Sequence, residues 1–209
     1  MEKVWTCSGE RPSAVSRHLM ENLSPAWKML LLSDGSVTRH VELLTGRDVE
    51  VECLEMAEVD FNNNNNNNNN NVSSSSPPLD ALGISGPVLQ RQVYLYSEAE
   101  ADPLVYAVSW WNKAKADAFL TDVESPIWVN LSENKTELFR EVKALYRGHS
   151  PELDKAMGVE GPYWGRHYCF WHGGEPLTVI YEAFSNKLDD YLSDTSCATE
   201  QQQQREGGP

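Results

Sequence analysis

One carboxylate lies in the middle of a stretch that otherwise predicts a buried β-strand. In "TVIYEAF", residues 178–184, side chains alternate across a strand, so Ile180, Glu182 and Phe184 share one face. A carboxylate among apolar groups is costly unless it gains a partner or a proton. Glu182 is therefore expected either to pair with a cation or to serve in chemistry.

The natural cationic counterpart is Arg91, in the strand-like run "LQRQVYL". It shares a face with Val93 and Leu95. Two interpretations stay open. Arg91 and Glu182 form a structural ion pair, or Arg91 holds a ligand carboxylate while Glu182 faces the other end of the ligand. Because desolvation offsets the attraction within a buried pair, physics favours neither interpretation.

The run "GPYWGRHYCFWH", residues 161–172, invites a metal interpretation that its spacing opposes. On a strand, His167 and Cys169 face one way and His172 the other, so no metal site is predicted. Arg166 is a second candidate ligand for an anion, with a surface salt bridge as the alternative. Cys169, within an aromatic strand and outside any nucleophile motif, is predicted to pack in the core.

Composition restricts the partners. The net charge is −14 and the isoelectric point is near 4.7, which opposes binding to nucleic acid. No apolar run reaches about 18 residues, so no membrane insertion is expected. The first residues contain no clear targeting segment. Four scattered cysteines fit a reducing compartment.

The chain of 209 residues is expected to form one domain. We place this domain at residues 23–192, after an N-terminal extension at 1–22. An Asn/Ser-rich insertion at 61–80, with ten consecutive Asn residues, and a tail at 193–209 are predicted to be disordered because they cannot bury apolar surface.

Local signals predict an α+β fold with a mainly antiparallel sheet, since the strand pairs are joined by short turns. Caps at Ser24 and Ser36 begin two helices, and a spacing of Leu138, Val142, Leu145 and Tyr146 predicts an amphipathic helix over 132–148. The other predicted elements are a strand at 48–56, a hairpin at 88–112, a helix at 150–158, and strands at 165–172 and 176–184 joined by "GGE".

Five stretches occur in an order and approximate spacing that resemble the chorismate lyase (4-hydroxybenzoate synthase) family, from about residue 23 to 192. They are "AWKMLLLSDGSVTRHVE", "LQRQVYLY", "PIWVNL", "YWGRHY" and "LTVIYEAFS". The chain looks most like the divergent branch found in oxygenic phototrophs. The resemblance implies a chorismate lyase-like fold and cleavage of chorismate to 4-hydroxybenzoate and pyruvate, without metal or organic cofactor, as the opening step of quinone biosynthesis.

The resemblance also implies roles for individual residues. Arg91 matches the arginine that binds the ring carboxylate, and Glu182 matches the glutamate that contacts the ring hydroxyl. Val37 and Ile127 match positions that contact the product through the backbone, where side-chain identity matters little. Both main residues are expected to be catalytic.

One departure concerns the second carboxylate of chorismate. Where better-known members carry a further arginine, this chain has Val108. Arg166 is expected to compensate, with Arg39 and His167 as alternatives. The rival function is a non-catalytic module that binds an aromatic acid, because the same superfold serves as the effector-binding domain of bacterial regulators. We expect a monomer in the cytoplasm or the plastid stroma.

Overall fold

The computed structural model describes residues 2–6, 23–59, 83–98, 100–122, 125–133 and 135–192. The predicted insertion at 61–80 lies outside the described residues, as does the predicted tail at 193–209. Most of the extension at 1–22 also lies outside them. Its residues 2–6 form a strand.

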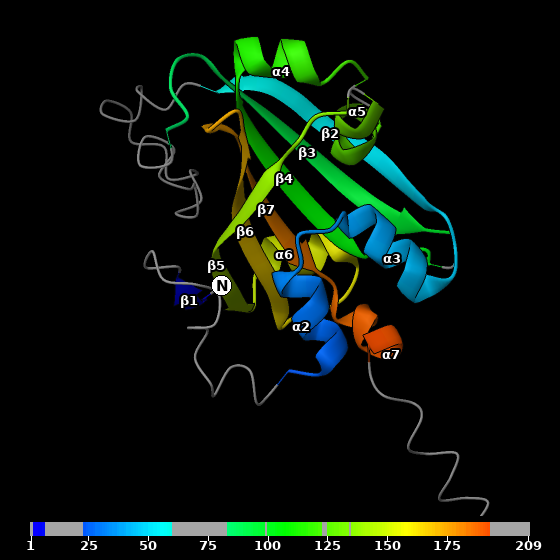
Figure 1. Cartoon of the computed structure of the whole chain (residues 1–209). Helices are drawn as coiled ribbons and strands as arrows, with labels where there is room; N and C mark the ends of the chain where they lie inside the picture. The colour runs from blue at the N-terminus through cyan, green and yellow to red at the C-terminus, as the bar shows by residue number, and fades with distance from the viewer. Residues whose placement is uncertain are drawn as a thin grey trace, which may run out of the picture.

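Within these ranges the strands form one antiparallel sheet in the order β1-β5-β6-β7-β4-β3-β2 (Figure 1). Strands β2, β3 and β4 form a first meander, and β5, β6 and β7 form a second meander. Pairing of β4 with β7 joins the two meanders, and β1 extends the sheet beyond β5. The strands are β1 (Glu2–Thr6), β2 (Val49–Val59), β3 (Val88–Ser97), β4 (Val105–Asn112), β5 (Phe139–Gly148), β6 (Tyr163–His172) and β7 (Glu175–Phe184).

Two helices begin at the caps that the sequence predicts. Ser24 caps α2 (Pro25–Leu32), and Ser36 caps α3 (Val37–Thr45), each by accepting a backbone hydrogen bond in the first turn. Helix α3 ends at Gly46, whose φ of 66° suits glycine. The remaining helices are α4 (Lys113–Phe119), α5 (Ile127–Glu133), α6 (Pro151–Met157), the 3-10 turn η4 (Asn186–Leu188) and α7 (Asp189–Leu192).

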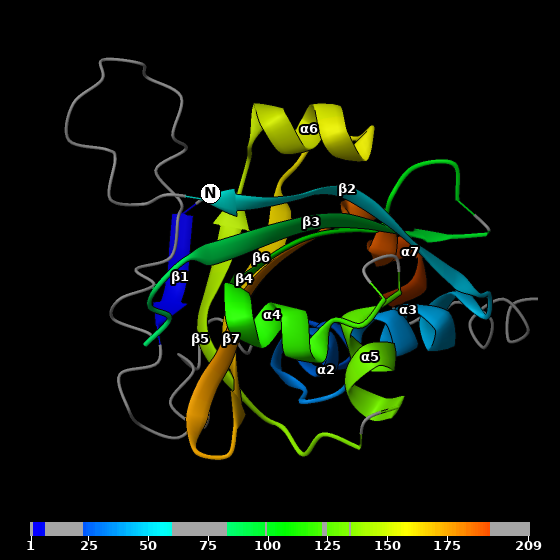
Figure 2. The ribbon, with the colours of Figure 1, turned by 90° about the horizontal axis from the view of Figure 1, so that it is seen from above.

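The two faces of the sheet carry different helices. Figure 2 shows α6 on one side of the strands, and α2, α3 and α5 on the other. We call the side with α2, α3 and α5 the inner face and the side with α6 the outer face. The prediction of a single α+β domain with a mainly antiparallel sheet is confirmed. Among the helices of the described residues, none has the length and apolar character needed to cross a bilayer.

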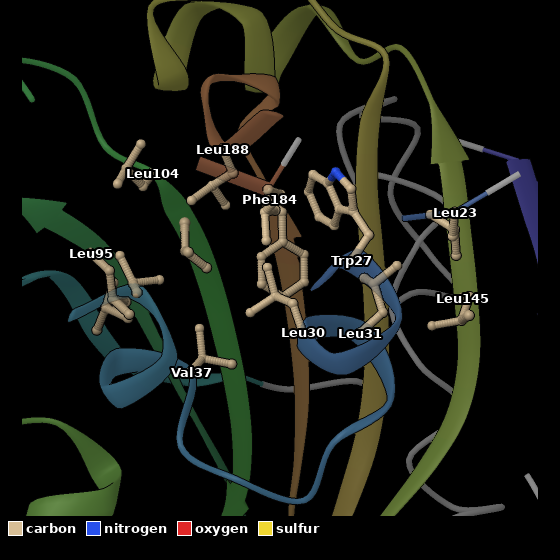
Figure 3. Close-up of a cluster of buried hydrophobic side chains, with 14 residues drawn as sticks. Leu23, Trp27, Leu30, Leu31, Val37, Leu95, Leu104, Leu145, Phe184 and Leu188 are labelled. Atoms are coloured by element: carbon tan, nitrogen blue, oxygen red, sulfur yellow. The ribbon is translucent and has the colours of Figure 1, made fainter. Parts of the chain in front are cut away.

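A cluster of buried side chains fixes α2 against the inner face (Figure 3). Trp27 meets Phe184 of β7 edge to face, with ring centroids 6.2 Å apart. Leu30 and Leu31, from the last turn of α2, are also buried in this cluster. The packing brings the C-terminal end of α2 close to the centre of the sheet, where its last carbonyl groups can act on the site.

The predicted helix over 132–148 is wrong. The structure has α5 ending at Glu133 and then strand β5, paired with β1 and β6. The pairing of β5 with β6 shifts register between Val142 and Ala144. This bulge places Val142 and Leu145, three residues apart, in the same inner-face core. The spacing therefore imitates a helical period within a strand.

Candidate functional site

A pocket opens on the inner face between the sheet and the helices. Its wall includes side chains from every strand from β2 to β7, the start of α3, and α5. Most of the lining is apolar, and the polar side chains on the sheet are Arg91, Arg140, Tyr168 and Glu182. The pocket is therefore an apolar cavity with a few polar groups placed at defined positions, which is the usual construction of a small-molecule site.

Arg91 lies on β3 and is only 2% exposed. It lines the pocket, and it shares the inner face with Val93 and Leu95, which also line it. Its Nη2 donates a hydrogen bond to the carbonyl oxygen of Ser125 at 3.0 Å. Ser125 stands just before α5, so Arg91 links the sheet to the segment that closes one side of the pocket.

Glu182 lies on β7, at the middle of the sheet, and is 5% exposed. Its Oε2 accepts from Arg166 Nε at 2.7 Å, and its Oε1 accepts from the Tyr168 hydroxyl at 2.8 Å. Its cationic partner is thus Arg166 on the neighbouring strand. Arg91 and Glu182 line one pocket, whereas Glu182 forms its ion pair with Arg166. Two donors therefore hold both carboxylate oxygens.

Arg166 is fully buried behind Glu182. Its Nη1 donates to the carbonyl oxygens of Leu30 and Leu31, both at 2.9 Å. These carbonyls belong to the last turn of α2, which lacks intrahelical donors and carries the negative end of the helix dipole. Arg166 lies outside the pocket lining. Its direct contact with a second carboxylate stays a prediction, and the geometry gives it a different position, as the partner that orients Glu182.

Val37 and Ile127 both line the pocket, as the resemblance implies. Each is the first residue of a helix, α3 and α5 respectively. Backbone N–H groups in the first turn of a helix have no acceptor within that helix. The two positions therefore bring helix starts, as well as side chains, to the edge of the pocket. Their contact with a product stays a prediction.

Sequence reasoning missed Arg140 and Tyr168. Arg140, on β5, is 7% exposed, and its guanidinium carbon lies 4.3 Å from the ring centroid of Tyr168 and 4.8 Å from that of Phe170. Burial raises the pKa of Tyr168 above its ordinary value, so this hydroxyl stays a donor. Arg140 was missed because residues 132–148 were predicted to form a helix, on which Arg140 belonged to the charged, solvated face. The strand β5 instead turns it toward the pocket.

His40 of α3 lies near the charged groups of the site. Burial, followed by the positive charges of Arg166 and Arg140, lowers the pKa of His40 below 6.5, while Glu182 acts in the opposite direction. Its Nδ1 lies 3.5 Å from Ser33 Oγ. Burial and the two arginines thus favour the neutral imidazole.

Other residues singled out from the sequence lie elsewhere. His167 and Cys169 belong to the outer face of β6, where His167 contacts the hydroxyl of Tyr146 and Cys169 packs in a separate core. Burial raises the pKa of the Cys169 thiol to about 11, which suits a core residue. Arg39 is exposed and pairs with Glu42 at 3.0 Å. Among the described residues, no group of three His, Cys, Asp or Glu side chains could hold a metal.

Val108 faces away from the pocket. On β4 its neighbour Ala107 lines the pocket, whereas Val108 packs into the core of the outer face with Trp110 and Val179. An arginine at position 108 would point to the wrong side of this sheet. The absence of that arginine therefore takes nothing away from this pocket.

Relatives and solved structures resemble the chain along most of its length. The protein ycf21 of Cyanophora paradoxa is 35% identical over 159 residues, or 76% of this chain and 76% of the relative. The ycf21 protein of Pyropia yezoensis is 29% identical over 165 residues, or 79% of this chain and 83% of the relative. Both relatives are described as uncharacterized.

Two bacterial structures share the fold. A possible transcriptional regulator, YydK from Bacillus subtilis, aligns with a TM-score of 0.55 at 15% identity, covering 79% of this chain and 67% of that chain. The effector domain of PhnF from Mycobacterium smegmatis aligns with a TM-score of 0.55 at 10% identity, covering 75% of this chain and 92% of that chain. Identities this low show a common fold alone.

The sequence also matches the model of a family described as "Chorismate pyruvate-lyase Rv2949c-like" over residues 31–192. That range contains strands β2 to β7 and every side chain that lines the pocket. The match therefore covers the whole site as well as the greater part of the fold, and the chain belongs to the Rv2949c-like chorismate pyruvate-lyase family.

Proposed function

We propose that the protein is a lyase that converts chorismate to 4-hydroxybenzoate and pyruvate. The observation that carries the proposal is that Arg91 and Glu182, from different meanders of the sheet, line one apolar pocket. Membership of the family supports the same reaction. Chorismate presents a ring carboxylate and a ring hydroxyl on opposite sides of its ring, so it can meet an arginine and a glutamate at two places in the pocket.

The reaction is an elimination. The ether bond between the ring and the enolpyruvyl group breaks, the carbon that bears the ring hydroxyl loses its hydrogen, and the ring becomes aromatic. The departing group takes up a proton and becomes pyruvate. No net oxidation or reduction occurs, so the proposed reaction requires no redox cofactor, and we propose that it proceeds without metal or organic cofactor.

The side chains would contribute position and charge. Arg91 would bind the ring carboxylate through a charge-assisted pair of hydrogen bonds. Glu182, held by Arg166 and Tyr168, would contact the ring hydroxyl and assist the movement of the ring proton. The apolar walls would exclude water and so strengthen both contacts. Val37 and Ile127 would place the starts of α3 and α5 against the ring.

The biological setting is also a proposal. We infer that the protein belongs to the divergent branch of oxygenic phototrophs, acts as a monomer in the plastid stroma or cytoplasm, and supplies 4-hydroxybenzoate for quinone biosynthesis. The relatives from Cyanophora paradoxa and Pyropia yezoensis support a photosynthetic source. The net charge of −14 supports a small-molecule partner rather than nucleic acid.

The direct test is incubation of purified protein with chorismate, with both products followed in time. We expect 4-hydroxybenzoate and pyruvate in equal amounts, and a loss of kcat/KM of about 100-fold or more in Arg91→Gln and in Glu182→Gln, since each removes a buried charged contact. Glu175→Gln is the matched control, because Glu175 lies on the same strand, pairs with Lys115 at 3.2 Å and is exposed.

Folded wild-type protein that releases neither product would contradict the proposal. Titration with 4-hydroxybenzoate then separates the alternatives. Binding that depends on Arg91 would support a non-catalytic module for an aromatic acid, in agreement with the fold shared with the effector domain of PhnF. If 4-hydroxybenzoate does not bind, both the lyase and the non-catalytic binding module are contradicted.

A further inference from the structure

Arg140 is a buried guanidinium whose donors are only partly used. Its side chain is 7% exposed, and its buried Nε and Nη1 have no hydrogen-bond partner within the described chain. No ion pair in this part of the structure includes Arg140. A buried charge without hydrogen bonds is unfavourable, so native proteins rarely keep one without a use.

Aromatic rings compensate only part of this cost. Tyr168 and Phe170 both lie close to the guanidinium carbon, at 4.3 and 4.8 Å from their ring centroids. Such contacts stabilise the cation and hold its plane, but they accept no hydrogen bond in the plane of the guanidinium. Nε and Nη1 lie on opposite sides of the guanidinium, and each can donate a charge-assisted hydrogen bond to a carboxylate oxygen.

Arg140 and Arg91 stand on opposite sides of Glu182 in the sheet. Arg140 is on β5, Glu182 on β7 and Arg91 on β3, so one strand separates each arginine from the glutamate. Neighbouring strands are about 4.8 Å apart, so two strand spacings separate each arginine from Glu182 across the sheet. Along the strands, Arg91 is level with Ile180 of β7 and Arg140 with Thr178, so both arginines lie on the same side of Glu182. All three side chains line that pocket.

We infer that Arg140 binds the second carboxylate of the ligand and thereby makes the pocket selective for dicarboxylates. The inference rests on the proposed function, and it names the residue that holds the enolpyruvyl carboxylate of chorismate. Arg166 is less suited to this role, because its Nε and Nη1 already donate to Glu182 and to the end of α2, and it lies outside the pocket lining. Arg166 Nη2 is also buried without a hydrogen-bond partner, but Arg140 has two such nitrogens and lines the pocket.

The test compares two unreactive probes that differ in one carboxylate. The probe 3-(carboxymethoxy)benzoate carries both carboxylates, and 3-methoxybenzoate lacks the second. At constant ionic strength, we expect calorimetry to give wild-type protein a Kd about 10- to 100-fold lower for the dicarboxylate, as a charge-assisted hydrogen-bonded pair predicts. In Arg140→Gln the preference should fall below about threefold, while the Kd for 3-methoxybenzoate changes by less than about threefold.

Arg147→Gln is the matched control. Arg147 lies on the same strand and also contacts an aromatic ring, Trp164 at 4.6 Å, but it does not line the pocket. Its replacement should leave the preference for the dicarboxylate unchanged. Arg140→Lys, which keeps the charge without the planar guanidinium, should retain part of the preference and provides the comparison if Arg140→Gln does not fold.

Two results would overturn the inference: a wild type without preference for the dicarboxylate, or a preference that persists in folded Arg140 variants. Its failure is distinguishable from failure of the proposed function. If the wild type turns over chorismate but Arg140→Gln keeps the preference for the dicarboxylate probe, the role of Arg140 is contradicted and the lyase activity is not. A preference that depends on Arg140, in a protein without chorismate turnover, removes the lyase activity and leaves Arg140 as a carboxylate ligand.

Discussion

Arg166 Nε lies 2.7 Å from Glu182 Oε2, directly across the pairing of β6 with β7. Both side chains are buried, at 0% and 6% exposure. Such a pair adds little net stability, because desolvation offsets the attraction, yet removal of one partner leaves a charge without compensation. The pair therefore fixes the position of Glu182 and makes each partner dependent on the other.

The first prediction concerns stability. Arg166→Met should lower the free energy of unfolding by about 3–5 kcal/mol, because Glu182 stays buried without its cation. The double variant Arg166→Met/Glu182→Leu should be more stable than Arg166→Met alone. Urea unfolding measures both effects. Lys187→Met, which breaks a partly exposed pair with Asp102, is the control and should cost less than about 1 kcal/mol. Equal stability of the single and double variants would argue against the coupling.

The second prediction concerns the Tyr168 hydroxyl. Tyr168→Phe removes one of the two donors to Glu182, so we expect a loss of about 1–3 kcal/mol in stability and a decrease in kcat of about tenfold or more. Tyr163→Phe is the control: Tyr163 also lies on β6 and donates to a carboxylate, Asp154 at 2.9 Å, but it packs with α6 on the outer face. A fall in kcat for both variants would mean that the effect is structural.

The third prediction concerns Val108. Since this residue lies in the outer-face core at 6% exposure, Val108→Arg should lower stability by about 2 kcal/mol or more without lowering KM for chorismate. Val108→Ile controls for volume. Thermal unfolding and steady-state kinetics measure the two effects. A stable Val108→Arg variant with a lower KM would show that position 108 reaches the ligand after all.

The fourth prediction concerns pH. Burial and the neighbouring arginines Arg166 and Arg140 lower the pKa of His40 in the folded state below 6.5. The unfolded chain therefore binds a proton first as the pH falls. The contribution of His40 to stability is full above pH 6.5 and is lost as the pH falls from there toward the folded pKa.

Urea titrations between about pH 7.5 and 5.5 test this, since they span the ordinary pKa of histidine. The free energy of unfolding of wild-type protein should fall more steeply with acidification than that of His40→Gln. The difference between the two proteins cancels the titration of the other groups. Parallel curves would contradict a lowered pKa for His40.

Features set by a few adjacent residues could be predicted from the sequence. The cap at Ser24 with Pro25 after it, the stop at Gly46, and the turn at Gly173 and Gly174 each act within one turn of chain. The alternation around Glu182 likewise assigned it to a buried face. All of these elements were found as predicted, because neighbours in sequence are sufficient to specify them.

Features set by pairing between strands could not be predicted. A two-residue turn after His172 would by itself place Gly165 opposite Glu182, but a register shift between Phe170 and Trp171 places Arg166 there. A second shift, within β5, gave that strand a helical spacing and left Arg140 unrecognised. Both shifts depend on the neighbouring strands, which a single sequence does not reveal.

The pairing of β4 with β7 has a consequence for the dynamics of the protein. It is the seam between the two meanders: Arg91 belongs to one side, and Glu182 and Arg140 belong to the other. A ligand held by both arginines would bridge that seam. Its binding would therefore stabilise the pairing of β4 with β7, and opening of the seam would require release of the ligand. Amide hydrogens of Val108 and Tyr181, which pair across that seam, would then exchange more slowly when the pocket is filled, while those at the far edge, in β2, would keep their rates.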